Sequence, residues 1–368
     1  MSDVTIFAPS PTLTVTVEEH DDEPDIHVHA GGQGVWQARM LLRLGVPVTI
    51  CCSLTGEVGR MLRHLLEDEG MTVAGVERPG KGSAYVHDRR GGERRIIAET
   101  GGDPLARHDL DELYGVTLRE GLASGLAILS GPAGDETLPA DTYRRLASDL
   151  HAGGAKVVVD LSGARLDAAI KGGVDVLKVS DEELASDGRV DDDSAAGIMA
   201  AMRRLRKDGA EAVIVSRSPE PMLLLDPDGF LEITAPRLEV ADTRGAGDSL
   251  TAGVAAGIAR GESVRDAIVT GAAAAALNVT RHGLGTGDPD AIAALRSAVT
   301  VRQLLDGAEA GMDQPVTGHV SPDGLAALAE PTERPPGEAS MERPPGEASS
   351  GDSPESGRSE TAESGNPR

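Results

Sequence analysis

Short, almost continuous apolar runs alternate with longer stretches of helical spacing from Val4 to about Leu305. Apolar runs of this kind are typical of strands that are buried on both faces of a parallel sheet. The expected strands cover residues 46–52, 126–130, 156–160, 174–179 and 212–216, and the clearest helices cover 57–70 and 139–154. This alternation predicts a doubly wound, mostly parallel α/β sheet with helices on both faces.

Two stretches depart from this alternation of strands and helices. Residues 12–29 and 83–98 alternate polar and apolar positions around turn signals, a pattern typical of half-exposed antiparallel strands. We expect these strands to form a small separate sheet, a β lid over the edge that carries the active site.

The chain changes character after residue 305. The octapeptide ERPPGEAS occurs at 333–340 and again at 342–349, in a segment rich in Ser, Gly, Glu and Pro. Such a composition cannot bury enough apolar surface to offset the entropy lost on ordering. We therefore predict a folded domain over 1–305 and a disordered acidic tail over 306–368, where the repeat is more simply a solvated spacer than a docking motif.

Composition and net charge limit the kinds of molecule that the protein is expected to bind. The formal net charge of −25 disfavours nucleic acid and anionic lipid, because phosphate-rich surfaces are bound by basic patches. No window holds 18 consecutive apolar residues, and the N-terminus lacks the pattern of a signal peptide. The only cysteines, Cys51 and Cys52, are adjacent, which excludes a disulfide framework and makes a reducing cytoplasm the expected setting.

The most informative segment covers residues 241–261, where a helix of small residues follows a strand-like stretch at 238–242. Gly245, Ala246 and Gly247 carry no bulky side chains. Backbone N–H groups at the helix start can therefore converge on an anion, and the helix dipole favours its negative charge. Asp248 follows in the first turn. Phosphoryl transfer needs both parts, donors for the oxygens of the migrating group and a base for the attacking hydroxyl. The simpler alternative is that Asp248 only caps the helix.

The string from Asp242 to Asp248, with Ser249 after it, resembles the C-terminal signature of the PfkB, or ribokinase-like, carbohydrate kinases. Residues 31–38 resemble the N-terminal glycine motif of that family, and 54–59 its next strand-to-helix turn, in the form closest to the 1-phosphofructokinase-like branch. The resemblance covers about residues 4–300.

This resemblance implies a ribokinase-like α/β fold and the ATP-dependent transfer of a γ-phosphoryl group to a hydroxyl of a sugar or sugar phosphate. It also implies Mg²⁺, with Asp248 as the catalytic base and Gly245, Ala246 and Gly247 as the anion hole. The substrates would be a small carbohydrate and ATP, and a homodimer is allowed but not required.

Further site residues follow from the same resemblance. The implied substrate-binding residues are Thr14, Gly32, Gln33, Gly34 and Trp36, and the implied nucleotide-binding residues are Lys178, Ser216, Asp242, Thr243, Gly247 and Asn278. Glu183 matches the family glutamate that acts on Mg²⁺ through water, although the dipole of a solvated helix start would favour an acid there equally. Residues 160–163 match a D-x-S-G turn of the family, to which we assign no role.

The departures from the family pattern lie on the acceptor side. Thr14 stands where the family has an Asp, Trp36 where it has an Asn, and Gln33 where it has a Lys. No residue matches the arginine that holds the substrate phosphate in phosphofructokinases, and the arginines at 89–95 resemble turn and strand-edge charges. We therefore expect fructose phosphates to be poor substrates. A nucleoside-type kinase, with the base stacked on Trp36, and a non-catalytic regulatory ligand-binding protein stay open as alternatives.

Overall fold

The computed structural model describes residues 2–304, except for residues 22, 92–93, 135, 191–193 and 282. The tail predicted over 306–368 lies outside the described residues. Within the described parts of the chain, no helix combines the length and the apolar character that crossing a bilayer requires.

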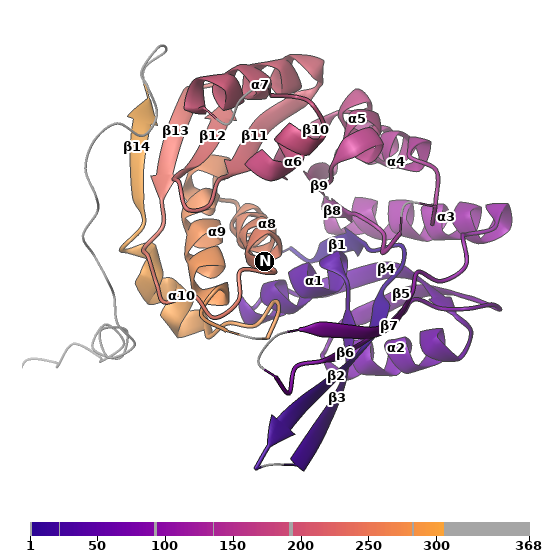
Figure 1. The fold of residues 1–368 in the computed structure, drawn as a ribbon. Coiled ribbons are helices and arrows are strands. Elements are labelled where there is room, and N and C mark those ends of the chain that lie inside the picture. The colour runs from indigo at the N-terminus through magenta and orange to yellow at the C-terminus, as the bar shows by residue number, and fades with distance from the viewer. Residues whose placement is uncertain are drawn as a thin grey trace, which may run out of the picture. The chain divides into compact units, whose positions relative to one another are not determined.

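A ten-stranded sheet forms the centre of the fold, with the strand order β14-β13-β12-β11-β10-β9-β8-β1-β4-β5 (Figure 1). The strands from β5 to β11 in this order run parallel, and β12, β13 and β14 extend the sheet in antiparallel fashion. Their bounds are β1 Val4–Phe7, β4 Val48–Thr55, β5 Thr72–Arg78, β8 Leu126–Ser130, β9 Lys156–Asp160, β10 Val174–Ser180, β11 Ala210–Ser216, β12 Met222–Asp226, β13 Gly229–Thr234 and β14 Thr300–Leu304. The mostly parallel sheet predicted from the apolar runs is confirmed.

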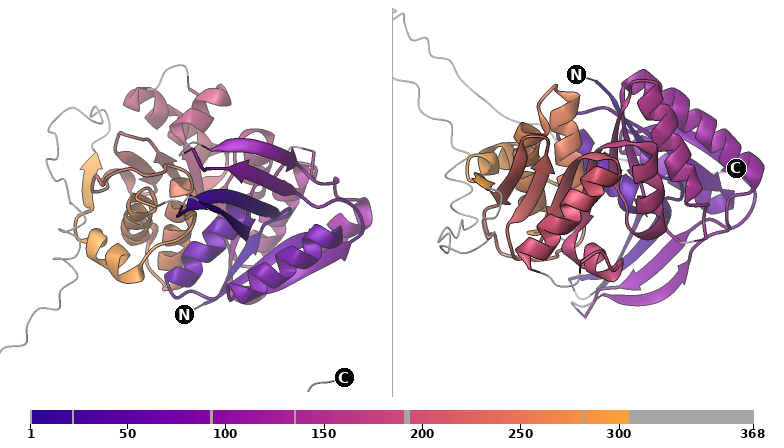
Figure 2. Two further views of the ribbon diagram at one scale, coloured as in Figure 1. Left: turned by 60° about the horizontal axis from the view of Figure 1, so that its bottom comes forward. Right: turned by 90° about the horizontal axis from the view of Figure 1, so that it is seen from above.

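Helices cover both faces of this sheet (Figures 1 and 2). They are α1 Gln33–Arg43, α2 Gly56–Asp68, α3 Arg107–Ser124, α4 Asp141–Ala152, α5 Gly163–Gly172, α6 Asp181–Ser186, α7 Ala195–Asp208, α8 Ala246–Ala259, α9 Val264–Asn278 and α10 Pro289–Arg296. Successive residues of a strand point to opposite faces, so Ile6 belongs to one hydrophobic cluster and Phe7 to the other. This doubly wound arrangement leaves the carboxyl ends of the parallel strands open for a site.

Helices α8 and α9 pack closely because glycines face each other where they cross. A Cβ added to Gly253 would lie 2.6 Å from the Cα of Gly271, so a side chain at this point would force the two helices apart. The stretch 238–242 before α8 is not a strand, contrary to expectation. The N–H groups of Ala241 and Asp242 both donate to the carbonyl of Val279, which ties this stretch to the end of α9 instead of a sheet.

The small second sheet is also confirmed, and its order is β3-β2-β6-β7. Its bounds are β2 Thr12–His20, β3 Glu23–Gly31, β6 Ala84–Asp88 and β7 Arg95–Thr100. The sheet is mixed and not purely antiparallel as expected, because β2 and β6 run parallel. It stands apart from the large sheet (Figures 1 and 2), and one of its faces carries the paired apolar side chains of Val15, Val28, Val86 and Ala98.

Candidate active site

Polar residues end the central parallel strands on one edge of the sheet. Ser130, Asp160, Ser180 and Ser216 are the last residues of β8, β9, β10 and β11. Ser216 pairs in register with Ser180, which brings this predicted nucleotide-binding residue to the same edge. In open α/β sheets ligands bind at this edge, outside the carboxyl ends of the strands.

The turn before α8 is held in a special conformation. Gly245 is the N-cap of α8 and has a φ of 72°, a left-handed conformation that glycine adopts without strain. Asn278 supports this turn: its Nδ2 donates to the carbonyl of Arg244 at 2.7 Å, and its Oδ1 accepts from the hydroxyl of Ser249 at 3.1 Å. Asn278 is completely buried, so a nucleotide-binding role, which remains a prediction, would act through the turn.

Lys178 brings a buried positive charge to the start of α8. Its Nζ lies 3.2 Å from Oδ1 of Asp160, and a Cβ added to Gly247 would lie 2.6 Å from the same Nζ. Only a glycine at position 247 therefore lets the ammonium group lie against the helix start. Burial lowers the pKa of Lys178, but the carboxylates of Asp160, Glu183 and Asp248 outweigh it and leave the pKa raised. The ammonium group stays protonated beside the predicted anion hole.

Asp248 lies in the first turn of α8 and is buried. Burial and the nearby carboxylate of Asp160 raise its pKa from 3.8 to about 8, against the opposing effects of Lys178 and Gln37. The Nε2 group of Gln37 donates to Oδ1 of Asp248 at 3.4 Å. A carboxylate with a raised pKa is a stronger base, and raised values of this kind are found at functional sites.

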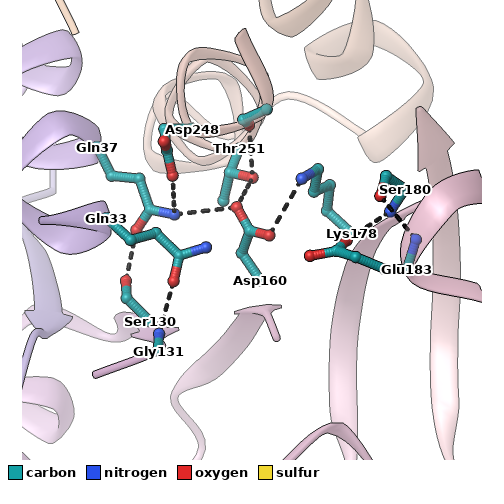
Figure 3. Close-up of polar contacts among 11 residues, drawn as sticks. Gln33, Gln37, Ser130, Gly131, Asp160, Lys178, Ser180, Glu183, Asp248 and Thr251 are labelled. Atoms are coloured by element: carbon teal, nitrogen blue, oxygen red, sulfur yellow. Dashed lines mark hydrogen bonds and ion pairs between the residues drawn. The ribbon is translucent and has the colours of Figure 1, made fainter. Parts of the chain in front are cut away.

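Asp160 is a site residue that the sequence interpretation missed. It is 1% exposed and lies at the centre of the polar contacts in Figure 3. Besides the ion pair with Lys178, it accepts hydrogen bonds from the Thr251 hydroxyl at 2.9 Å and from Nε2 of Gln37 at 3.1 Å. The available signal was the D-x-S-G match at the end of an apolar strand, because an acid there lies at the ligand-binding edge.

Glu183 forms a capping box with Ser180 at the start of α6. Its Oε2 accepts from the N–H of Ser180 at 2.7 Å, and its own N–H donates to the Ser180 hydroxyl at 3.1 Å. Glu183 therefore makes the contact expected of an acid at the start of a helix, which was the alternative to a role at the metal. A role on Mg²⁺ through water stays a prediction.

The predicted substrate-binding residues line one cavity of about 360 Å³. It lies between the small sheet, the start of α1 and the loop after β8, and its wall includes Thr14, Gly32, Gln33, Gly34 and Trp36. The Oε1 of Gln33 accepts from the N–H of Gly131 at 2.6 Å, and Figure 3 shows its amide nitrogen turned away from Gly131. The structure thus brings the five residues together around one cavity.

Arg94, just before β7, also lines this cavity. Its guanidinium lies 4.5 Å from the centre of the Tyr85 ring, and its Nε is buried without a hydrogen-bond partner. Among the described residues no carboxylate forms an ion pair with Arg94, whereas Arg90 and Arg95 both pair with Asp88. The interpretation of this stretch as strand-edge charges therefore fits Arg90 and Arg95 and is wrong for Arg94.

A second cavity of about 540 Å³ shares Thr14, Trp36 and Arg94 with the first. Its wall also includes Asp242, whose carboxylate pairs with Arg244 at 2.5 Å. The hydrogen bonds from Arg244 lower the pKa of Asp242 in spite of its partial burial. Thr243 lies between these two residues on the exposed turn, so both predicted nucleotide-binding positions lie shortly before the predicted anion hole in the chain.

Residues 3–291 match the family described as pfkB family carbohydrate kinase. The chain belongs to this family. The pfkB kinases transfer a phosphoryl group to a hydroxyl of their substrate, and the chain is therefore a phosphotransferase, as the resemblance implied.

Named relatives agree with this assignment. The chain is 27% identical over 262 residues to the 1-phosphofructokinase of Bacillus subtilis, and the aligned region covers 70% of this chain and 84% of that protein. It is 26% identical over 257 residues to the ATP-dependent 6-phosphofructokinase isozyme 2 of Escherichia coli, with 69% and 82% covered.

The fold agrees with solved structures at low sequence identity. Phosphofructokinase-2 of Escherichia coli in complex with fructose-6-phosphate aligns with a TM-score of 0.70 and 22% identity, covering 81% of this chain and 99% of that chain. Ribokinase of Arabidopsis thaliana with ribose and ATP aligns with a TM-score of 0.62 and 21% identity, covering 80% and 99%. The ribokinase-like fold is confirmed.

Proposed function

We propose that this pfkB kinase transfers the γ-phosphoryl group of ATP to a hydroxyl of a sugar phosphate, as a 1-phosphofructokinase-like enzyme. One observation carries the proposal: a buried carboxylate, Asp248, and a buried ammonium group, Lys178, meet at the start of α8. The cavity at the start of α1, the helix from which Gln37 contacts Asp248, is lined by Arg94, a guanidinium without a carboxylate partner among the described residues.

The start of α8 fits a phosphoryl group chemically. The N–H groups of Ala246 and Gly247 and the ammonium of Lys178 supply donors and positive charge to its oxygens. When bound, ATP supplies the migrating group and Mg²⁺ neutralises charge on the phosphates. We assign the metal to Glu183 through water, and nucleotide contacts to Ser216, Asp242 and Thr243, with Asn278 acting through the turn.

Asp248 acts as the general base in this proposal. Its carboxylate accepts the proton of the acceptor hydroxyl as the oxygen attacks the γ-phosphorus, and the bond from that phosphorus to the bridging oxygen breaks so that ADP leaves. The raised pKa of Asp248, about 8 in the free protein, increases its affinity for that proton. The acidic limb of the pH–rate profile should consequently lie well above the usual range of an aspartate.

The acceptor is proposed to carry a phosphate because of Arg94. A guanidinium forms two parallel hydrogen bonds with phosphate oxygens, and the stacking of Arg94 on Tyr85 holds it at the cavity wall. Glu99 lines the same cavity and is suited to accept hydrogen bonds from sugar hydroxyls. This proposal replaces the expectation that fructose phosphates are poor substrates, since that expectation took Arg94 for a strand-edge charge and not for a residue of the cavity wall.

A nucleoside-type kinase is the second candidate, because Trp36 offers a flat face to both cavities. Initial rates with Mg²⁺ and ATP separate the candidates when fructose 1-phosphate, fructose 6-phosphate, fructose, ribose and nucleosides are compared. We expect a phosphorylated sugar to exceed its unphosphorylated form in kcat/KM by about 100-fold. Preferred turnover of a nucleoside would contradict the proposal, and the absence of any turnover would favour a non-catalytic binding protein.

Two further expectations belong to this proposal. A cytoplasmic setting is supported by Cys51 and Cys52, which are both free and buried. A homodimer is supported by the exposed apolar side chains of Ile26 and Val28, which are 62% and 42% exposed on the small sheet. The sedimentation of the purified chain measures the second expectation directly.

A further inference from the structure

Gln37 connects the proposed base to the rest of the buried network. It lies on α1 one turn after Gln33, is completely buried, and contacts three polar side chains. Its Nε2 group donates to Oδ2 of Asp160 at 3.1 Å and to Oδ1 of Asp248 at 3.4 Å. Its Oε1 accepts from the hydroxyl of Ser130 at 2.5 Å. Figure 3 shows the amide between the two carboxylates and the end of β8.

The contacts determine which way the amide points. The carboxylate oxygens of Asp160 accept hydrogen bonds from Lys178 and Thr251. The amide nitrogen of Gln37 is therefore the end that faces Asp160, and it also donates to Asp248 when that carboxylate is ionised. The carbonyl oxygen then faces Ser130, and the Ser130 hydroxyl must donate to it. Ser130 is itself completely buried, and its carbonyl accepts from the hydroxyl of Tyr143 at 2.9 Å. The orientation of Gln37 is therefore fixed from both sides.

The charges around Asp248 show why a neutral donor matters here. Burial is the main cause that raises the pKa of Asp248, and Asp160 on β9 and Glu183 on α6 add to it, while Lys178 on β10 and the hydrogen bond from Gln37 on α1 lower it. Thr251 on the next turn of α8 donates to Asp160 and not to Asp248. Lys178 is the one cation that counters Asp160 and Asp248 among the described contacts. An amide adds donors between the acids without adding a group that titrates.

We propose that Gln37 is a positioning residue for the general base: its amide nitrogen bridges Asp248 and Asp160 and holds the Asp248 carboxylate in place, while Ser130 orients the amide. This inference rests on the proposed role of Asp248. The proposal predicts an effect on the base itself. The variant Gln37→Met removes the amide but keeps the length of the side chain, so the packing of α1 in the core is preserved.

The first test is the pH dependence of kcat/KM for Gln37→Met, Ser130→Ala and a control, Met40→Leu. Met40 is a completely buried residue of α1 that belongs to the hydrophobic core. We expect Gln37→Met to move the acidic limb upward by about one pH unit, so that kcat/KM falls about tenfold below the limb and recovers at high pH. Ser130→Ala should move it less in the same direction, and Met40→Leu should not move it.

A loss in Gln37→Met that is equal at every pH would overturn the proposal, because it would indicate a structural role alone. An unchanged pH profile would also overturn it. If Gln37→Met does not fold, Ser130→Ala carries the test, since it removes only the hydroxyl that orients the amide.

The second test needs no turnover. Loss of the donor raises the pKa of Asp248 further, so the Tm of Gln37→Met should go on falling between about pH 8 and about pH 9, an interval in which the wild-type curve levels off. The difference should disappear when both chains also carry Asp248→Asn. Equal slopes with Asp248 present would overturn the proposal. A wild type without kinase activity would overturn the proposed function only, because this comparison of slopes would still report the contact between Gln37 and Asp248.

Discussion

The two ends of the active site are built in different ways. The proposed phosphoryl-transfer end consists of one continuous segment, residues 242–248, together with Asp160 at the end of β9 and Lys178 near the end of β10. The acceptor end is assembled from β2, β6, the start of α1, the loop after β8 and Arg94 before β7. A single short motif is therefore enough to indicate the chemistry in the sequence, whereas the choice of acceptor depends entirely on how distant segments are brought together. The following substitutions separate the two ends.

The largest effect is expected for Asp248→Asn, which keeps the size of the side chain and removes the base. Loss of general-base catalysis lowers kcat by about 10²–10⁴, and ATP binding should stay nearly unchanged because the start of α8 keeps its donors. Steady-state rates and nucleotide titration measure both quantities. Asp290→Asn, at an exposed position in the first turn of α10, is the matched control and should retain full activity. Substantial activity in Asp248→Asn would exclude Asp248 as the base.

Arg94→Met should affect the acceptor end of the site and lower activity only toward phosphorylated acceptors. Charge-assisted hydrogen bonds contribute about 1.5–3 kcal/mol, so kcat/KM for a phosphorylated acceptor should fall about 10- to 100-fold. Turnover of unphosphorylated sugars should change little. The control Arg90→Met removes an arginine that pairs with Asp88 outside the cavity wall. A similar loss for both classes of acceptor would show that Arg94 supports the fold of the small sheet and not the phosphate.

Gly247→Ala tests the space that Lys178 requires at the transfer end. The new Cβ would lie 2.6 Å from Nζ of Lys178, so the flexible lysine would have to move away from the anion hole. We expect kcat/KM to fall about tenfold or more. The Tm should also fall, because the displaced ammonium group leaves the buried carboxylate of Asp160 without its ion-pair partner, which outweighs the gain of about 1 kcal/mol from the better helix former. An unchanged Tm together with full activity would contradict this account of Gly247.

The smallest effect concerns stability and pH. The pKa of Asp248 is raised in the folded chain from 3.8 to about 8, so the folded state binds a proton more tightly than the unfolded state. Stability is therefore lost as pH rises through this interval, because the slope follows the difference in bound protons. Asp248→Asn should be more stable than the wild type at pH 8, by about 1 kcal/mol or more, with a flatter dependence. Thermal unfolding of both chains from pH 5 to 9 measures this difference in stability. Curves of stability against pH that run parallel for the two chains would refute the prediction.

The sequence by itself determined the parallel sheet, the small second sheet and the segment 242–248. Each of these depends on residues that are neighbours in the chain: apolar runs that form buried strands, alternating positions that form half-exposed strands, and a glycine turn that starts a helix. The resemblance of these segments to the pfkB kinases was specific enough to predict the fold and the class of reaction.

Only the tertiary structure decided which side chains meet. Gln37 contacts Asp160 and Asp248 across separations of 123 and 211 residues, and nothing in the local pattern around position 37 indicates a polar partner. Arg94 has the sequence surroundings of a strand-edge charge, yet the pairing of β6 with β7 places it at the cavity wall beside Tyr85. The physical reason is that parallel strands distant in sequence end at the same edge of a sheet, so buried charges and their partners are matched there by topology and not by spacing along the chain.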